Sequence, residues 1–450
     1  MNAYLASVLE SVKTKHGNEP EFVQTVEEVL SSLEPVIEKH PEYEKVDLLG
    51  RMVEPERMFT FRVVWCDDNG QWHTNRGWRC QFNGAIGPYK GGLRFQKNVY
   101  EGIIKFLGFE QTFKNSLTGL PIGGAKGGSD FDPAGKSDAE VMRFCQSFMT
   151  ALYRYIGPDI DVPAGDMGVG GREIGYLYGQ YRRLKGVWEN GVLTGKGLSY
   201  GGSLIRPEAT GYGAMYYLQE VLKHENDTIE GKRIAISGYG NVGWGIMKKA
   251  SQLGAKVTYF AGPDGYVHDP DGVITDEKLN FILEMRAKDP MHCKPYADKF
   301  GCEFVPGEKC WGVKDVDVYM PAAMQNDVKM ESAEKIAASG VKYYIEVANM
   351  PTTNDALEFL KEQKHMVVAP SKAVNAGGVS VSELEMAQNA ERLYWTAEEV
   401  DAKLKGIMKN IYHNSVEAAE RYGLGYDLVA GANIVGFQKV ADAMMAQGIF

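Results

Sequence analysis

Three lysines and one aspartate stand in settings that could support chemistry. Lys90 lies in "GPYKGGLRF", Lys114 in "FEQTFKNSL", Lys126 in "PIGGAKGGSDFDP" and Asp166 in "VPAGDMGVGG". Lysine is normally a hydrated surface cation, whereas glycine gives up side-chain packing so that backbone can bend freely or approach something closely. Taken one at a time, each lysine fits a solvated surface and Asp166 fits a turn, so their meaning depends on the rest of the chain.

The glycines around Lys126 allow three interpretations: a phosphate-binding loop, a loop that presents lysine to a small anionic substrate, or a surface turn. A phosphate-binding P-loop requires G-x-x-x-x-G-K-[ST], and Lys126 is followed by Gly127 instead of Ser or Thr. The nearby "AGKSD" ends correctly, but Asp130 occupies the position of the first glycine, where a carboxylate would repel phosphate. A kinase or NTPase is therefore not predicted.

A dinucleotide-binding signature begins at residue 238. Gly238, Gly240 and Gly243 in "SGYGNVG" match G-x-G-x-x-G, with the strand-like "RIAIS" before them and the helix-like "WGIMKKASQLG" after them. The first glycine permits the tight turn, the second lets backbone reach the pyrophosphate, and the third lets helix and strand pack closely. The helix N-terminus then offers free N–H groups to the phosphates. An ordinary βα turn without a ligand is the alternative.

The residues after the next expected strand bear on the choice of cofactor. An acid that holds the adenosine ribose is usual about 20 residues after the loop, where this chain reads "TYFAGPDGYVH". Asp264 comes slightly later, and His268 is the only possible cation of this stretch for a 2′-phosphate. These residues favour NAD over NADP, although another loop could supply a cation.

Beside a nicotinamide site, the three lysines and Asp166 predict a pocket for a small dianion whose chemistry includes proton transfer. Gln111 is three residues before Lys114, so both side chains share one helix face. An ordinary lysine, with a pKa of about 10.4, is charged and cannot act as a base. Burial beside Lys90 and Lys114 is therefore expected to lower the pKa of Lys126. We expect the glycines to clear side chains away from its amine.

The elements that would position these residues fall into two regions. Helical spacing covers residues 1–55 and 138–185, and a β-hairpin is expected at 58–83. From about residue 200, strand candidates alternate with helices, which predicts an open parallel sheet.

The fold class expected is therefore α/β, with two domains and an active-site cleft between them. An N-terminal α/β substrate-binding and oligomerisation domain is expected to span residues 1–200. A Rossmann-type doubly wound dinucleotide-binding domain is expected to span residues 201–424, and the helix at 425–450 to return to the first domain.

Composition limits the class of protein. With 44% hydrophobic and 24% charged residues the chain is of the ordinary globular type, and its net charge of -10 disfavours nucleic acid or an anionic membrane as a partner. Six scattered cysteines without a C-x-x-C pair argue against a zinc site and for reduced thiols in the cytoplasm, and no metal is expected. No stretch approaches the roughly 20 apolar residues of a membrane span.

Longer segments resemble the bacterial hexameric glutamate dehydrogenases of the Glu/Leu/Phe/Val dehydrogenase superfamily, nearly end to end. They are "FNGAIGPYKGGLRF", "KFLGFEQTFK", "GGAKGGSDFDP", "DVPAGDMGVGGREIG", "GGSLIRPEATGYG", "YIEVANMPTT" and "SKAVNAGG". The resemblance implies reversible oxidative deamination of L-glutamate to 2-oxoglutarate and ammonium in a homohexamer. The motifs "AGPDG" and "EVANMP" resemble those of the NAD-preferring members. The same reaction with NADP, or a non-catalytic dinucleotide-binding regulator, are the alternatives.

The resemblance also implies a role for individual residues. It makes Lys126 the catalytic lysine and Asp166 the group that moves protons to and from the reacting nitrogen. The substrate-binding residues would be Lys90 and Ser382 for the side-chain carboxylate, Lys114, Gln111 and the backbone of Gly165 for the α-carboxylate, and also Thr194, Asn375 and Val379. The cofactor-binding residues would be Thr210, Gly238, Gly240, Asn241, Val242, Gly243, Pro263, Asp264, Asn326 and Asn349.

Two residues depart from the pattern of the family. Glu383 stands where glycine usually follows the serine equivalent to Ser382, and its carboxylate would repel the carboxylate of the substrate. Met324 stands close to the cofactor, where threonine is common. Lys90 keeps the pattern, and it is expected to select a side-chain carboxylate because the leucine, valine and phenylalanine dehydrogenases look apolar or different there.

Overall fold

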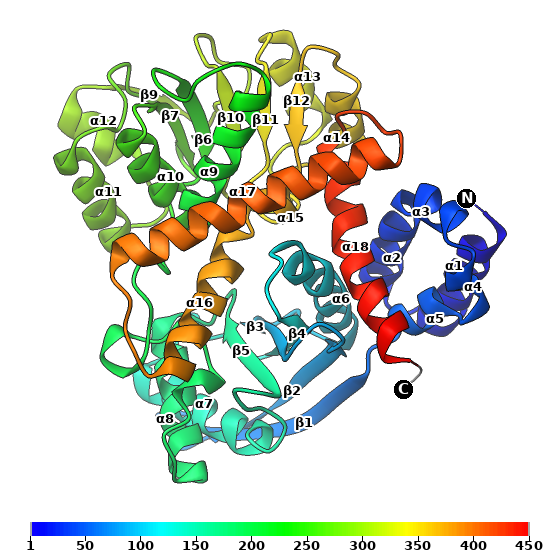
Figure 1. The fold of residues 1–450 in the computed structure, drawn as a ribbon. Helices are drawn as coiled ribbons and strands as arrows, with labels where there is room; N and C mark the ends of the chain where they lie inside the picture. Colours follow the sequence, from blue (N-terminus) through cyan, green and yellow to red (C-terminus); the bar gives the residue numbers. More distant parts are fainter. Residues whose placement is uncertain (1, 449–450) are drawn as a thin grey trace.

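Two β-sheets organise the chain in the computed structural model, which describes residues 2–448 (Figure 1). The first sheet has the strand order β1-β2-β4-β3-β5, and the second has the order β12-β11-β10-β6-β7-β8-β9. The strands of the first are β1 (Arg57–Cys66), β2 (Trp72–Asn83), β3 (Tyr89–Phe95), β4 (Gly123–Ser129) and β5 (Asp161–Gly165). Those of the second are β6 (Arg233–Ser237), β7 (Lys256–Gly262), β8 (Gly265–His268), β9 (Glu303–Pro306), β10 (Val318–Pro321), β11 (Tyr343–Ile345) and β12 (Val367–Ala369).

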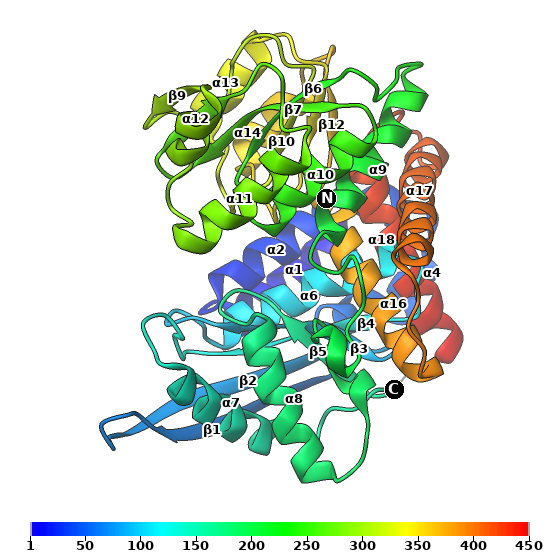
Figure 2. The ribbon, with the colours of Figure 1, turned by 90° about the vertical axis from the view of Figure 1, so that its left-hand side faces the viewer.

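The first sheet is covered by helices on both faces (Figure 2). Strands β1 and β2 form the predicted antiparallel hairpin, and β3 runs parallel to both β4 and β5. Helix α6 (Glu101–Leu117) packs on β4 and β2, whereas α7 (Asp138–Leu152) packs on β1 and against α8 (Gly171–Lys185). This arrangement brings the three segments that carry Lys90, Lys126 and Asp166 side by side.

The glycine-rich segment around Lys126 is a buried strand, β4, and not the expected loop. A Cβ atom on Gly124 would lie 2.0 Å from Oγ1 of Thr112 on α6, and one on Gly128 would lie 2.3 Å from the carbonyl oxygen of Arg94 on β3. Glycine is needed here because helix α6 and strand β3 approach the backbone of β4 more closely than any side chain allows.

The second sheet confirms the predicted α/β class, with one difference at its edge. Strands β12, β11, β10, β6 and β7 are parallel, whereas β8 and β9 turn back to form an antiparallel edge. The order reverses between β6 and β10, which is the topological switch point where open α/β sheets bind ligands. The helices around this sheet are α9 (Ala209–His224), α10 (Asn241–Gln252), α11 (Asp276–Lys288), α12 (Lys294–Phe300), α13 (Met330–Ala338) and α14 (Asn354–Lys361).

The chain ends on helices that lie beside its beginning (Figure 1). Short helix α15 (Ser371–Val374) and helix α16 (Gly377–Glu391) lead into the long α17 (Ala397–Arg421), which packs along α9. Helix α18 (Leu428–Gln447) packs on α6 and α2 and shares one apolar core with the N-terminal helices. Those are α1 (Ala3–His16), α2 (Pro20–Ser32), α3 (Glu34–Lys39), α4 (Glu42–Lys45) and α5 (Leu48–Met52). The domain limits at residues 200 and 424 stay a prediction.

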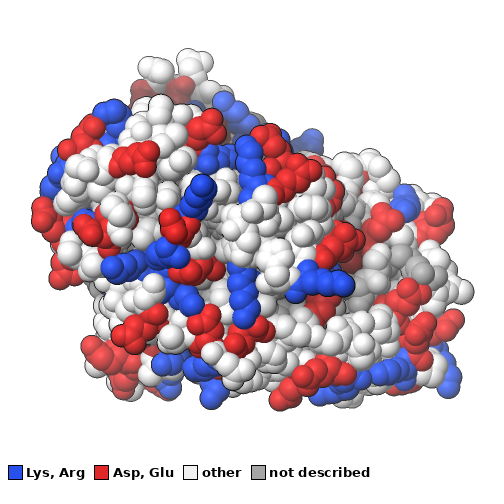
Figure 3. Space-filling view, turned by 90° about the horizontal axis from the view of Figure 1, so that it is seen from above, with Lys and Arg blue, Asp and Glu red and all other residues white. Residues whose placement is uncertain are grey.

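The surface mixes charges of both signs. Acidic and basic side chains are interspersed over the face seen from above in Figure 3. Within residues 2–448, no helix is both long and apolar enough to cross a bilayer. All six cysteines are free thiols.

Candidate active site

Lys126 on β4 and Asp166 just after β5 form an ion pair, although β3 lies between these two strands in the first sheet. The Lys126 Nζ atom lies 2.7 Å from Oδ2 of Asp166, which directly follows β5. Nε of Arg94 on β3 lies 3.2 Å from the same oxygen. Only 8% of the Lys126 side chain and 17% of the Asp166 side chain are exposed, so the pair is largely shielded from solvent. Two predicted residues therefore meet, together with an arginine that the sequence did not single out.

The electrostatics of this pair differ in part from expectation. Burial lowers the pKa of Lys126 against the opposing charge of Asp166, and Arg94 and Arg79 lower it further. The predicted direction is thus correct, but burial is the largest cause and the two arginines were missed. Lys114 and Lys126 do repel each other, and burial together with this repulsion lowers the pKa of Lys114 to about 8. Burial opposes ionisation of Asp166, yet Lys126 and Arg94 outweigh it and hold its pKa at about 2.

A second group of cations and hydroxyls surrounds Lys90. Nζ of Lys90, which is 1% exposed, donates a hydrogen bond to Oγ1 of Thr194 at 2.8 Å. Nε of Arg206 donates to Oγ of Ser382, also at 2.8 Å. Burial, and then the charge of Arg206, lower the pKa of Lys90 to about 7. Two cations and two hydroxyls can together receive a carboxylate, and Arg206 is a further residue that sequence reasoning missed.

A buried network fixes this group in place. Glu385 on α16 accepts hydrogen bonds from the backbone N–H of Gly195 at 3.0 Å and from Nζ of Lys196 at 2.7 Å. The side chains of Glu385 and Lys196 are fully buried, so they pair with each other and not with solvent. Because Ser382 is three residues before Glu385 on the same helix, the network aligns Ser382 with the loop that carries Thr194.

Lys114 faces the second sheet. Its Nζ atom lies 3.4 Å from Oδ1 of Asn349, which also accepts a hydrogen bond from Nδ2 of Asn375 at 2.9 Å. Oδ1 of Asn375 is buried and has no hydrogen-bond partner among the described residues. Gln111 donates to Asn115 at 2.6 Å, one turn further along α6. Predicted substrate-binding and cofactor-binding residues thus meet across the space between the two sheets.

A cavity of about 790 Å³ lies at the carboxyl end of β6. It is lined by five of the predicted cofactor-binding residues, namely Gly238, Gly240, Asn241, Val242 and Pro263, and by Met324. Gly238 has φ +78°, which favours glycine, and a Cβ atom on Gly243 would lie 2.1 Å from the carbonyl oxygen of Gly238. The glycines therefore make the tight turn and the close helix–strand contact that the motif predicts.

Comparison with known proteins decides the family. A model described as "Glu/Leu/Phe/Val dehydrogenase, dimerisation domain" matches residues 55–183, and one described as "Glutamate/Leucine/Phenylalanine/Valine dehydrogenase" matches residues 201–448. The chain belongs to this dehydrogenase family. The resemblance stated from the motifs is confirmed.

Relatives resemble the chain over its whole length. The NAD-specific glutamate dehydrogenase of Clostridium symbiosum is 68% identical, with 100% of both chains covered. The NADP-specific glutamate dehydrogenase of Haemophilus influenzae is 51% identical, with 100% of this chain and 99% of that one covered. A solved glutamate dehydrogenase structure that is 68% identical superposes with a TM-score of 0.98, covering 100% of both chains.

Arg286 and Asp264 bear on which cofactor the cavity beside Gly238 can hold. Arg286 on α11 lines it, donates from Nη2 to Oδ1 of Asn241 at 2.6 Å, and keeps a buried Nη1 without a partner among the described residues. Another element thus supplies a cation, as the sequence left open. The carboxylate of Asp264 accepts hydrogen bonds from the backbone N–H groups of Cys293 and Lys294, where α12 begins. Its role in binding the ribose stays a prediction.

The remaining predicted residues lie around these two groups. Thr210 is the second residue of α9 and lies close to Gly378 of α16. Val379 follows Gly378 on that helix, and the carbonyl oxygen of Gly165 faces Gly92. Asn326 donates its backbone N–H to the carbonyl of Met350 at 3.0 Å.

Glu383 is the departure from the family pattern that affects the substrate site. Burial raises its pKa to about 7 against the opposing charge of Lys90, and its buried Oε2 has no partner among the described residues. The carboxyl group of Glu383 therefore interacts with the cation expected to hold the substrate.

Proposed function

We propose that the protein is a glutamate dehydrogenase that oxidatively deaminates L-glutamate to 2-oxoglutarate and ammonium, reversibly, with transfer of the hydride to NAD. The observation that carries the proposal is the separation of two cationic groups. Lys90 and Arg206 lie with two hydroxyls, whereas Lys114 lies with the Lys126–Asp166 pair. A substrate with two carboxylates fits such a site. Identities of 68% and 53% to NAD-specific glutamate dehydrogenases support the substrate and the cofactor.

The two cationic groups would hold the substrate by its two ends. The side-chain carboxylate lies at Lys90, with Thr194 and Ser382 as hydroxyl donors and Arg206 behind Ser382. The α-carboxylate lies at Lys114 and Gln111. Charge-assisted hydrogen bonds at both ends fix the α-carbon between them, which is what positions it for reaction.

Lys126 and Asp166 would then move the protons. Because burial lowers the pKa of Lys126, a neutral amine is accessible that can take a proton from the water attacking the iminium carbon. The departing amine needs a proton in turn. Once Lys126 is neutral, the larger of the two charges that keep the pKa of Asp166 low is gone and only that of Arg94 remains, so the pKa rises and the carboxylate can pass a proton to and from the nitrogen.

The cavity beside Gly238 fits a dinucleotide. A Cβ atom on Gly240 would meet nothing within 4 Å, so the backbone there is open to a close-lying phosphate. The N-terminus of α10 and the unpartnered Nη1 of Arg286 supply positive charge at the same place. When bound, NAD accepts the hydride of the substrate α-carbon. The free guanidinium nitrogen of Arg286 also makes NADP a second candidate cofactor.

The proposal includes a homohexamer in the cytoplasm. One relative, 26% identical over 93% of this chain with a TM-score of 0.79, is described as a hetero-hexameric glutamate dehydrogenase from Thermus thermophilus. The family model at residues 55–183 describes a dimerisation domain, and Trp72 is 75% exposed within it. Free thiols on all six cysteines suit a reducing compartment.

One assay tests the reaction. The enzyme is given 2-oxoglutarate and ammonium with NADH or NADPH, and oxidation of the cofactor is followed by absorbance. Lys126→Ala is expected to lower turnover by about 10²- to 10⁴-fold while dinucleotide binding, followed by fluorescence, is retained. Lys97→Ala, whose side chain is 84% exposed, is the matched control and should behave as wild type. Failure to oxidise either cofactor would disprove the reaction, and normal turnover in Lys126→Ala would disprove the role of the lysine.

A further inference from the structure

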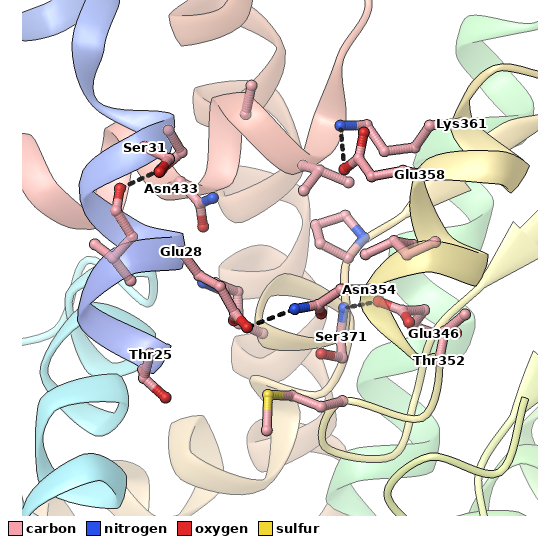
Figure 4. Close-up of a pocket in the computed structure, with 18 of the residues that line it drawn as sticks. Thr25, Glu28, Ser31, Glu346, Thr352, Asn354, Glu358, Lys361, Ser371 and Asn433 are labelled. Atoms are coloured by element: carbon pink, nitrogen blue, oxygen red, sulfur yellow. Dashed lines mark hydrogen bonds and ion pairs between the residues drawn. The ribbon is translucent and has the colours of Figure 1, made fainter. Parts of the chain in front are cut away.

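A second cavity, of about 590 Å³, lies between the N-terminal helices and the second sheet (Figure 4). Its walls come from α2, α6 and α18 on one side. The segment after β11, α14 and the start of α15 form the other side. This volume suits a small organic molecule and exceeds what a single ion needs.

The lining of this cavity is acidic. Five glutamates and two lysines contribute to it, namely Glu27, Glu28, Glu110, Glu346, Glu358, Lys361 and Lys372. The carboxylates of Glu28, Glu110 and Glu346 all act on the half-buried amine of Lys372. The excess of carboxylates excludes a phosphate or a nucleotide as the ligand.

Unpaired acceptors point to a ligand that donates hydrogen bonds. Glu346 is 3% exposed, and its Oε2 accepts a hydrogen bond from the backbone N–H of Ser371 at 3.2 Å. Its Oε1 has no hydrogen-bond partner within residues 2–448, and neither has the buried Oδ1 of Asn433 on α18. Buried acceptors are normally satisfied, so two unsatisfied ones on facing walls indicate a missing donor.

The cavity shares its walls with the candidate active site. On α6, Glu110 faces the cavity and Lys114, one turn later, faces Asn349. After β11, Glu346 lines the cavity and Asn349, three residues later, contacts Lys114 and Asn375. Only helix α6 and the segment after β11 therefore separate a charge in the cavity from the candidate active site.

The two sides of the cavity are also joined directly. Nδ2 of Asn354 on α14 donates a hydrogen bond to Oε1 of Glu28 on α2 at 2.5 Å, as the dashed line in Figure 4 marks. A ligand seated beside this contact would touch both the N-terminal helices and the second sheet, and it would hold them at their present separation.

We propose that this cavity binds an organic cation with two or more ammonium groups, of the aliphatic diamine or polyamine class. Its ammonium groups would pair with carboxylates on separate walls, Glu110 on one and Glu346 on the other. A metal ion fits less well, because no group of three metal-ligating side chains is found within residues 2–448. If the proposed function holds, neutralising Glu110 weakens the electrostatic support of the Lys114 cation, and the KM for glutamate rises.

Calorimetric titration with spermidine and putrescine tests the site without relying on activity. At pH 8, where Glu346 is ionised although burial raises its pKa to about 7, and at about 150 mM salt, where exposed charges are screened, we expect saturable binding with one site per subunit. Glu110→Gln removes a half-buried charge partner and Glu346→Gln a buried one, and each should raise Kd about tenfold or more. Glu362→Gln, at the end of α14 and outside the cavity, is the matched control and should leave Kd unchanged.

Three results would overturn the proposal. The first is absence of binding up to about 10 mM polyamine, since the affinity would then be weaker than a built site gives. The second is equal affinity of wild type and both cavity variants, because the cation would then bind elsewhere on this acidic chain. Equal binding of the neutral 1,4-butanediol shows that charge is not recognised. If Glu346→Gln unfolds, Glu110→Gln still decides, because the Glu110 carboxylate has no hydrogen bond to lose within the described residues.

Discussion

Binding of a dicarboxylate next to Lys90 is expected to take up protons. Burial and the charge of Arg206 lower the pKa of Lys90 to about 7 in the free protein. At pH 8 such an amine is neutral in about nine of ten molecules. A substrate carboxylate at hydrogen-bond distance favours the ammonium form, so the pKa rises on binding and a proton is taken from solvent.

The size of this uptake follows from the shifted pKa values. At pH 8, Lys90 contributes up to about 0.9 proton per site, and Lys114, with a pKa of about 8, contributes up to about 0.5. Glu383, with a pKa of about 7, adds up to about 0.9, because a new carboxylate nearby favours its neutral form. For Lys90 alone, whose pKa is higher in the complex, affinity is greatest below about pH 7 and falls about tenfold per unit above it, until the pKa of the complex is reached; uptake at Lys114 and Glu383 makes the fall steeper.

Calorimetry with glutarate, a dicarboxylate that cannot react, measures this uptake. Titration at pH 8 in buffers of different ionisation enthalpy gives the number of protons as the slope of observed enthalpy against buffer enthalpy. We expect the slope to drop by about 0.9 in Glu383→Gly, and in Lys90→Met if glutarate still binds. Lys97→Ala should keep the wild-type slope. A wild-type slope of zero would refute the pKa reasoning, because no group at the site would then change its protonation on binding.

Three further substitutions test other parts of the structure. Arg94→Met removes a charge that lowers the pKa of Lys126, so this pKa should rise and the acid limb of the pH profile for kcat should move to higher pH. An unchanged acid limb would contradict the role of Arg94. Arg286→Met should raise the KM for NADH about tenfold and leave that for 2-oxoglutarate unchanged, and equal effects on both would argue against a cofactor contact. Gly91→Ala would place Cβ 1.6 Å from the carbonyl oxygen of Ala125, and this clash should cost about 1–3 kcal/mol of stability, measured as a lower Tm. Gly406→Ala, in open space on α17, is the control and should not lower the Tm.

The parts of the fold that the sequence predicts are those with short-range signals. The hairpin of β1 and β2 is marked by "DDNG" between aromatic and branched residues, and the turn after β6 is marked by its glycine spacing. The antiparallel edge at β8 was missed, because it depends on a hairpin beginning at Gly262, where the sequence predicts only parallel strands.

The residues missed in the site are those whose partners are distant along the chain. Arg206 donates to Ser382, which is 176 residues away, and Lys196 pairs with Glu385, which is 189 residues away. One sequence contains no signal for such pairs. Asp264 is the opposite case, a residue that the sequence does single out. Its distance from the glycine loop predicts a ribose contact, whereas in the structure its carboxylate accepts hydrogen bonds from the start of α12.

The glycines around Lys126 act on it through packing and not through a flexible loop. Strand β4 has no β-branched or aromatic residue, so sequence propensity gives no indication of a strand. Its glycines let β2, β3 and α6 close around the backbone, and this closure buries the amine of Lys126. Burial is the largest cause of the lowered pKa, so the reactivity of the lysine depends on residues that have no side chain. A larger residue at Gly124 or Gly128 should therefore alter the pH dependence of turnover even where the ion pair with Asp166 survives.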